Sequence, residues 1–277
     1  MGEINVRSMT VEDFAFAIRL SNTMNWGLRE EDFALMMDLE PEGCFVAWNN
    51  EERVGIATTI EFGPIGWIGN LIVSHNHRSR GVGSQLGKHA VKYLTGRSVT
   101  TIGLFSYEEL VPFYEKFGFK CDTQFVRLVG SGAAADLGTV NRMVEKDLQR
   151  VFELDESCTG MLRDKLLRRI FADWKELCYV SYKNTRLVGF IMARETEVGP
   201  LICLPDFQEE SIILLQAVQN ALPGQTVYLG LAKQKKKILS FLRNLNFKDD
   251  FSVVKMYRGD PPESKDCVVA MESLERG

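Results

Sequence analysis

The sequence lacks the features that mark membrane and secreted proteins. No run of apolar residues approaches the roughly 18 that a membrane-spanning helix needs, and the N-terminal MGEINVRSMT has no apolar signal-peptide core. The myristoylation pattern is also missing, because position 6 is Val6 rather than Ser or Thr. We therefore expect a cytoplasmic protein that does not bind membranes.

Metal-site and disulfide patterns are missing as well. The six cysteines are scattered and form no Cys-x-x-Cys pair, so they lack the spacing of a zinc site or a disulfide framework. His75, His77 and His89 lie near one another without a cysteine, and we expect no metal site. The formal net charge of −4 is unlike that of a protein that coats nucleic acid, and we expect no such partner.

What the sequence does contain is typical of a globular protein with alternating strands and helices. Hydrophobic residues make up 45% and charged residues 25% of its 277 residues, a length that suits one or two domains. Strand patterns cover 44–48, 53–62, 67–73, 99–105 and 119–129. Helix patterns follow Thr10, cover 30–39, begin near Gly83 and cover 108–116. This alternation predicts a mixed α/β (α+β) fold.

The second part of the chain repeats the first. RVG at 53–55 resembles LVG at 187–189, IGNLI at 68–72 resembles VGPLI at 198–202, and FYEKFGFK at 113–120 resembles FLRNLNFK at 241–248. The offset shrinks slowly, from 134 to 130 to 128 residues. We therefore expect two tandem domains of one fold, at 1–130 and 139–277, each a mixed central sheet flanked by helices. The small-residue stretch SGAAADLG at 131–138 is interpreted as the linker between them.

A basic, glycine-rich turn connects the apolar run LIV at 71–73 to a helix pattern. Glycines let the backbone N–H groups converge on one point, the following helix adds its unpaired N–H groups, and the arginines add positive charge. Neither GxxxxGK[ST] nor GxGxxG is present. The turn therefore indicates a diphosphate site, and the alternative is a tight turn with solvated arginines. Its residues are Arg78, Ser79, Arg80, Gly81, Val82, Gly83 and Ser84.

This turn and a later segment resemble two motifs of the GNAT superfamily of N-acetyltransferases. The family pattern [QR]xxGxG[AG] is met by Arg78, Gly81 and Gly83, with Ser84 in place of the usual small apolar residue. About 30 residues on, the pattern FYxKxGF is met by Phe113, Tyr114, Lys116, Gly118 and Phe119. The resemblance covers roughly 4–130 and implies acetyl-CoA as cosubstrate. It places the pyrophosphate on the turn and pantetheine along Leu71, Ile72 and Val73.

The resemblance also implies a general acid. The family places a tyrosine at the position of Tyr114 against the sulfur of CoA, where a phenol can protonate the leaving thiolate. The alternative is an aromatic residue that only packs in the core. Backbone groups of the strand 67–73 would polarise the thioester carbonyl.

The general base is less well defined. Asn70 lies in the strand before the turn and cannot act as a base, so we assign it to substrate binding. Glu61 ends the preceding strand and is the nearest candidate, with an exposed strand-end carboxylate as the alternative. Asn25 and Trp26 fall where family members contact the acceptor, although Trp26 could equally fill the core.

The second copy does not keep these residues. At the offset of 130, the turn falls on QEESII at 208–213, where acids replace arginines and both glycines are gone. Tyr114 corresponds to Leu242. We therefore expect a degenerate GNAT-like domain without a CoA site, opened by a helix at 161–174. It would shape the acceptor pocket or form an oligomer interface.

The sequence thus predicts an acetyl-CoA-dependent N-acetyltransferase that moves an acetyl group to a primary amine by direct transfer. The alternative is a non-catalytic acyl-CoA-binding regulatory or scaffold module. The acceptor, a small-molecule or a protein amine, is not specified by the sequence. Neither are the general base, the role of the second domain and the oligomeric state.

Overall fold

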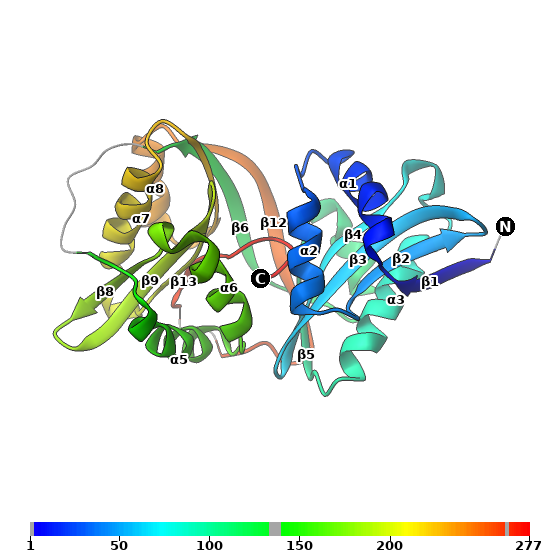
Figure 1. Cartoon of the computed structure of the whole chain (residues 1–277), viewed down its shortest axis with the longest axis horizontal. Coiled ribbons are helices and arrows are strands. Elements are labelled where there is room, and N and C mark those ends of the chain that lie inside the picture. Colours follow the sequence, from blue (N-terminus) through cyan, green and yellow to red (C-terminus); the bar gives the residue numbers. More distant parts are fainter. Residues whose placement is uncertain (1–2, 133–139, 264–265) are drawn as a thin grey trace.

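The computed structural model describes residues 3–132, 140–263 and 266–277 (Figure 1). We call the residues up to 132 the first half and those from 140 the second half. The first half contains β1 (Ile4–Ser8), α1 (Phe14–Asn22), α2 (Glu30–Leu39), β2 (Cys44–Asn49), β3 (Glu52–Phe62), β4 (Ile65–Val73), α3 (Val82–Thr95), β5 (Thr101–Ser106), α4 (Val111–Glu115) and β6 (Lys120–Ser131).

The second half repeats this order of elements. It contains β7 (Asn141–Arg142), α5 (Leu148–Thr159), α6 (Asp164–Trp174), β8 (Tyr179–Lys183), β9 (Arg186–Arg194), β10 (Glu197–Cys203), α7 (Glu210–Ala221), β11 (Thr226–Ala232), α8 (Lys236–Asn244), β12 (Lys248–Arg258) and β13 (Val268–Ala270). The three predicted sequence repeats fall on β3 and β9, on β4 and β10, and on α4 and α8 with the strands that follow them. The predicted internal repeat is therefore confirmed.

The two halves share one mixed sheet because they exchange a strand. The strand order is β1-β2-β3-β4-β5-β12-β6-β11-β13-β10-β9-β8-β7. β12 of the second half pairs with β5 of the first, and residues 125–131 of β6 pair with residues 226–232 of β11. β6 and β12, which occupy equivalent places in the repeat, also pair with each other and cross between the two lobes (Figure 1). Neither half therefore has a complete sheet of its own.

Side chains alternate between the two faces of the sheet, as the period of two in a strand requires. In β2, Cys44 and Val46 pack with α1 and α2, whereas Phe45 and Ala47 pack on the other face with α3. The apolar residues of α3 recur at helical spacing and are buried against that second face: Val82, Leu86, Ala90 and Leu94. The amphipathic pattern seen in the sequence thus places α3 with its N-terminus beside the end of β4.

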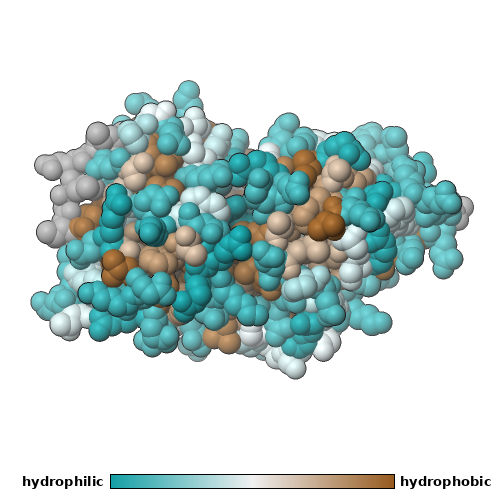
Figure 2. Space-filling view, in the orientation of Figure 1, coloured by the Kyte–Doolittle hydropathy of each residue, from teal (hydrophilic) through white to brown (hydrophobic). Residues whose placement is uncertain are grey.

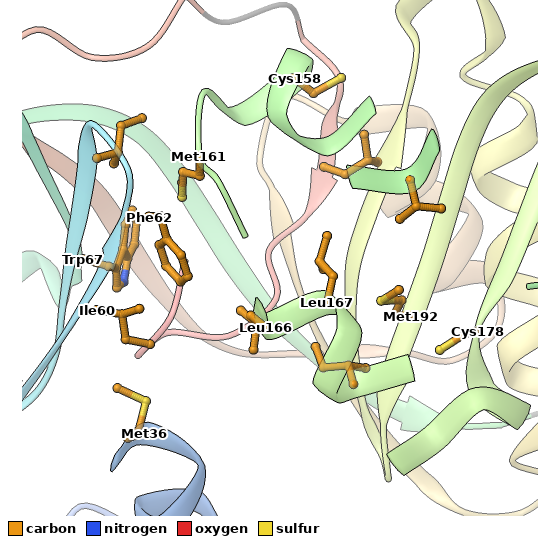
Figure 3. Close-up of a cluster of buried hydrophobic side chains, with 14 of the residues drawn as sticks. Met36, Ile60, Phe62, Trp67, Cys158, Met161, Leu166, Leu167, Cys178 and Met192 are labelled. Carbon is orange, nitrogen blue, oxygen red and sulfur yellow. The ribbon is translucent and has the colours of Figure 1, made fainter. Parts of the chain in front are cut away.

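The hydrophobic core continues across the boundary between the halves. One cluster of buried side chains includes residues from both (Figure 3): Met36, Ile60, Phe62 and Trp67 on one side, and Met161, Leu166 and Leu167 on the other. A backbone hydrogen bond from Leu162 N to Phe62 O, 3.1 Å long, joins them as well. Shared core and shared sheet together fix the position of one half against the other.

Two details differ from the sequence expectations. The second half opens with α5, not with the helix expected at 161–174, which corresponds to α6 and begins at Asp164. The expected linker at 131–138 begins with Ser131, the last residue of β6, and Gly132, whereas 133–139 lie outside the described residues.

The surface is mixed in character. On the face shown in Figure 2, hydrophilic residues predominate and hydrophobic residues form small patches between them. The large hydrophobic residues exposed among those described lie far apart in the chain: Val11, Leu110, Val144 and Leu162. None of the helices in the described ranges combines the length and the hydrophobicity that crossing a bilayer requires.

The exchange predicts how a divided chain behaves. We expect fragments 1–132 and 139–277 to co-purify when expressed together, because each supplies a central strand of the other's sheet. Expressed alone, each should be insoluble or melt without cooperativity. As a control, Lys255→Pro in the second fragment removes an N–H from β12, which is paired on both sides, and should prevent co-purification. A soluble monomeric fragment that melts cooperatively would contradict the exchange.

Candidate functional site

The predicted anion-binding turn forms a tight bend ahead of α3. Ser79 and Gly81 both have left-handed backbone angles, with φ of 60° and 84°, and Gly81 is the residue that caps α3. The helix runs for 14 residues from this turn, and its first N–H groups have no partner within the helix. A glycine at position 81 is needed because a side chain strains this backbone. The turn therefore presents backbone donors and a helix N-terminus to the same space.

The turn borders a cavity of about 1200 Å³ that reaches from α3 into the second half. Five of the seven predicted turn residues line the cavity: Arg78, Ser79, Gly81, Gly83 and Ser84. Arg80 is exposed outside it, and Val82 is buried in the core beneath α3. Arg78 Nε donates to Val73 O at 3.1 Å, which fixes the turn against the end of β4.

The cavity opens where β4 and β5 separate. These parallel strands pair over residues 65–68 and 101–104, after which β4 continues to Val73. At the same place β4 bulges. Ile72 lies opposite Ile56 and Gly69 lies opposite Thr58, so β4 uses three residues where β3 uses two. Asn70 in the bulge has a left-handed φ of 49°. Its side-chain amide donates to Thr58 Oγ1 at 3.2 Å, so this residue shapes the strand. All three predicted strand residues, Leu71 to Val73, line the cavity.

Tyr114 of α4 lies at the turn end of this opening. It is 9% exposed, lines the cavity, and packs edge-on against Phe113 and Phe119. Burial raises the pKa of its phenol to about 12, so the hydroxyl keeps its proton over the whole range in which proteins work. The structure thus brings together Tyr114, the turn and the bulged strand, as the sequence analysis expected.

Two aromatic residues border the next part of the cavity. Trp26 Nε1 donates to the Tyr107 hydroxyl oxygen at 3.0 Å, and the Tyr107 ring packs against Phe251 of β12 with centroids 5.5 Å apart. Asn25, with a φ of 57°, turns the chain into this wall. Both residues predicted to bind the acceptor, Asn25 and Trp26, therefore line the cavity.

Charged side chains from the second half and from β6 complete the wall. Arg127 of β6 donates to Glu197 Oε1 at 2.6 Å and to Asp250 Oδ2 at 2.8 Å, and its guanidinium stacks over Tyr228 at 4.1 Å from the ring centroid. Burial raises the pKa of Glu197, although Arg127 opposes that rise. Arg194 of β9 binds Asp32 of α2 at 2.7 Å and joins the two halves beside the cavity.

The C-terminal tail, residues 271–277, forms the floor of the same region. Its residues 271–275 line the cavity, and Figure 1 shows the C-terminal end between the two lobes. The tail follows β13, which lies between β10 and β11 in the second half. The cavity is therefore built from both halves, with the tail between them.

Glu61, the predicted base, lies elsewhere. It pairs across the strands with Gly66, whereas Gly55 pairs with Val73 at the other end of β4. Arg97 at the end of α3 donates to Glu61 Oε2 at 3.0 Å, and Glu61 does not line the cavity among the described residues. Because β3 runs antiparallel to β4, its last residues lie beside the start of β4 and away from the bulge. The structure therefore does not support Glu61 as the base.

The equivalent region of the second half is occupied by the chain itself. Glu210 begins α7, and its carboxylate accepts a hydrogen bond from Ser181 at 2.6 Å and binds Lys183 at 2.5 Å. β10 and β11 pair at Glu197 and Tyr228, and β13 then fills the space between them. A carboxylate thus stands at the helix N-terminus, and a strand stands in the opening between the two parallel strands.

Sequence reasoning missed several residues of the cavity wall. Tyr107 and Arg127 lie near the second motif in the sequence but outside its pattern, whereas Glu197, Asp250 and the tail lie in the second half, far from both motifs. Only the acids at 272 and 275 beside Arg276 formed a local charged pattern. In the described part of the chain, no three His, Cys, Asp or Glu side chains are grouped to hold a metal ion.

Comparison with known proteins places this geometry in a family. A model of the acetyltransferase (GNAT) family matches residues 13–119, and a model of an acetyltransferase (GNAT) domain matches residues 151–268. No curated protein sequence matches the chain.

Solved structures resemble the chain over nearly its full length. A candidate acetyltransferase from Pyrococcus horikoshii has a TM-score of 0.84 at 19% identity, covering 99% of this chain and 96% of that one. A GCN5-related N-acetyltransferase from Sphaerobacter thermophilus has a TM-score of 0.68 at 13% identity, covering 94% and 96%. A tandem GNAT protein from the clavulanic acid biosynthesis pathway has a TM-score of 0.64 at 13% identity, covering 95% and 100%.

At these sequence identities the solved structures establish the fold alone. The two family matches, one in each half, establish the family. The chain belongs to the GNAT family of acetyltransferases and carries two GNAT domains in tandem.

Proposed function

We propose that the protein transfers the acetyl group of acetyl-CoA directly to a primary amine. One observation carries the proposal: a single cavity joins the turn at the N-terminus of α3, the bulged part of β4, Tyr114 and a further chamber, which we define as the part lined by Trp26, Tyr107, Arg127, Glu197 and the tail. The turn suits the diphosphate of CoA, and the edge of β4 suits its pantetheine arm. The chamber beyond leaves room for an acceptor, which favours an enzyme over a module that only binds acyl-CoA.

Tyr114 acts on the leaving sulfur in this proposal. As the C–S bond breaks, negative charge collects on the sulfur, and the phenol donates a hydrogen bond to it. With a pKa of about 12, the phenol is a weaker acid than a thiol, whose pKa is about 8.5. The phenol proton of Tyr114 is therefore hydrogen-bonded to the sulfur in the transition state but stays on the phenol. The thiolate takes its proton from water.

The second domain contributes part of the wall of the acceptor chamber and holds no CoA of its own. Two contacts support this part of the proposal: the Glu210 carboxylate at the start of α7 repels a diphosphate, and β13 fills the opening between β10 and β11. A cytoplasmic location also fits, because the six cysteines form no disulfide in the described part of the chain and five of them are buried.

The proposed function is tested by incubating the protein with acetyl-CoA and single amines, namely spermidine, glucosamine, free lysine and a lysine-containing peptide. We expect thiol release that depends on one class of amine, with the acetylated amine detected by mass spectrometry. Binding of acetyl-CoA without acetylation of any amine would instead establish the non-catalytic acyl-CoA-binding module.

A substitution in the turn tests the CoA site. Gly83→Glu puts a negative side chain at the predicted diphosphate position, and we expect the affinity for CoA, measured by calorimetry, to fall well over tenfold. Gly83→Ala is the matched control, because a Cβ there would meet its nearest neighbour, Val73, at an ordinary 3.5 Å. Since the second domain is proposed to hold no CoA, the Glu variant should show no residual site. Unchanged binding in a folded Glu variant would refute the assignment.

Tyr114→Phe tests the role of the phenol. The ring packing with Phe113 and Phe119 is kept, so CoA affinity and melting temperature should stay the same. We expect kcat to fall roughly 10²-fold with little change in KM for acetyl-CoA, because one donor to the developing charge is lost. Tyr182→Phe, which removes a hydroxyl in the second domain that bonds Asp147, serves as the control. A Tyr114 variant within about twofold of wild type would show that this residue only packs.

A further inference from the structure

The C-terminal tail brings a carboxylate to the bulged part of β4. The backbone of Glu275 lies against Gly69 so closely that a Cβ on Gly69 would stand 2.6 Å from Glu275 Cα. Trp67 Nε1 donates to Leu274 O at 3.2 Å. These contacts place the tail on the face of β4 that Trp67 and Gly69 share, next to Asn70 in the bulge.

Buried ion pairs hold the tail in this position. Arg276 binds the Glu272 carboxylate through Nε at 2.9 Å and Nη2 at 3.2 Å, and both side chains are fully buried. Arg163, itself bound to Asp155 through two nitrogens, donates to Gly277 O at 2.5 Å. The ordering of the tail therefore depends on contacts other than the Glu275 side chain.

Glu275 is the tail carboxylate that faces the reaction space. It lines the cavity, and its side chain is 14% exposed. Within the described residues it forms an ion pair with Arg276, with Oε1 and Nη1 3.0 Å apart. A carboxylate in this position is a side chain that can accept a proton from a bound group.

The proposed reaction needs such an acceptor of protons. An alkylamine is protonated at neutral pH, since its pKa resembles the value of about 10.4 for lysine, and a protonated amine has no lone pair for attack. We infer, resting on the proposed function, that Glu275 is the general base that deprotonates the acceptor amine beside the bulge of β4.

The ammonium group of the acceptor gives one proton to the Glu275 carboxylate, and the amine lone pair forms the C–N bond to the acetyl carbon. The nitrogen then loses its second proton to water as the C–S bond breaks with its electron pair on the sulfur, and the sulfur, which is stabilised by Tyr114, takes a proton from water. Glu275 returns its proton to solvent. The products are the N-acetyl amine and free CoA, with one proton released overall.

Most of the other carboxylates that line the cavity bind an arginine: Glu197 and Asp250 bind Arg127, Asp32 binds Arg194, Glu195 binds Arg29 and Glu272 binds Arg276. Glu109 also lines the cavity, but it is exposed to solvent just ahead of α4. The negative charge of Glu275 adds to the rise in the pKa of Glu197, and both residues line the same cavity. Glu275 stands out among them because its backbone touches β4, next to the site of attack.

The experiment compares two small amines that differ in protonation. Methylamine is charged at neutral pH, whereas O-methylhydroxylamine is similar in size and neutral. With acetyl-CoA at pH 7, we expect Glu275→Gln to lower kcat/KM for methylamine by roughly 10²-fold. The same variant should stay within about threefold of wild type for O-methylhydroxylamine, which needs no base. CoA affinity and melting temperature should not change.

Glu61→Gln, which alters a carboxylate outside the cavity, is the matched control and should leave both rates unaltered. Equal loss with both amines would show that Glu275 only shapes the site, and no loss with either would show that it is not the base; each result overturns the inference. A selective loss in Glu61→Gln would overturn it too. A wild-type protein that acetylates neither amine, nor any amine of the panel, refutes the proposed function instead.

Discussion

The reciprocal exchange of β6 and β12 is the constraint on which the rest of the structure depends. Both strands lie in the middle of the sheet, each paired on both sides, so that separating the halves breaks several rows of backbone hydrogen bonds at once. Each such bond contributes only about 0.5–1.5 kcal/mol net, but leaving its groups buried and unpaired costs more. The two domains therefore behave as one rigid unit, and a cavity built between them keeps its shape.

The exchange also determines which side chains meet. Arg127 enters from β6 and Asp250 from β12, so this ion pair stands where the strands cross from one domain to the other. The same opening between two parallel strands occurs twice in the fold. In the first domain it forms the large cavity, and in the second it is closed by β13, whose following residue Met271 lies so close to Gly230 that a Cβ there would meet its side chain at 1.8 Å. Tandem repetition thus produces one open site and one filled copy.

Features set by a few neighbouring residues could be predicted from the sequence, whereas contacts between distant segments could not. The turn and Tyr114 were predicted because each is set by a short motif, and the bend needs only contiguous residues such as Ser79 and Gly81. Glu61 lies away from the cavity because β3 runs antiparallel to β4, which puts the end of β3 beside the start of β4, an orientation that its assignment as the base did not take into account. α5 escaped notice because Asp155 interrupts its apolar face, where it is buried only by virtue of its pairing with Arg163. The tail has no sequence link to β4, from which it is separated by about 200 residues.

The buried ion pairs that hold the tail explain why a short segment can occupy one position. Desolvating two charges costs about as much as their attraction returns, so Glu272 with Arg276 contributes little net stability. Any other tail conformation, however, would leave a buried charge without its partner, at a cost of several kcal/mol. The ion pairs therefore select one conformation of the tail over others, and that conformation holds Glu275 against β4. In this arrangement the first domain binds the acyl donor in our proposal, while the second domain, through the tail, sets where the acceptor must lie.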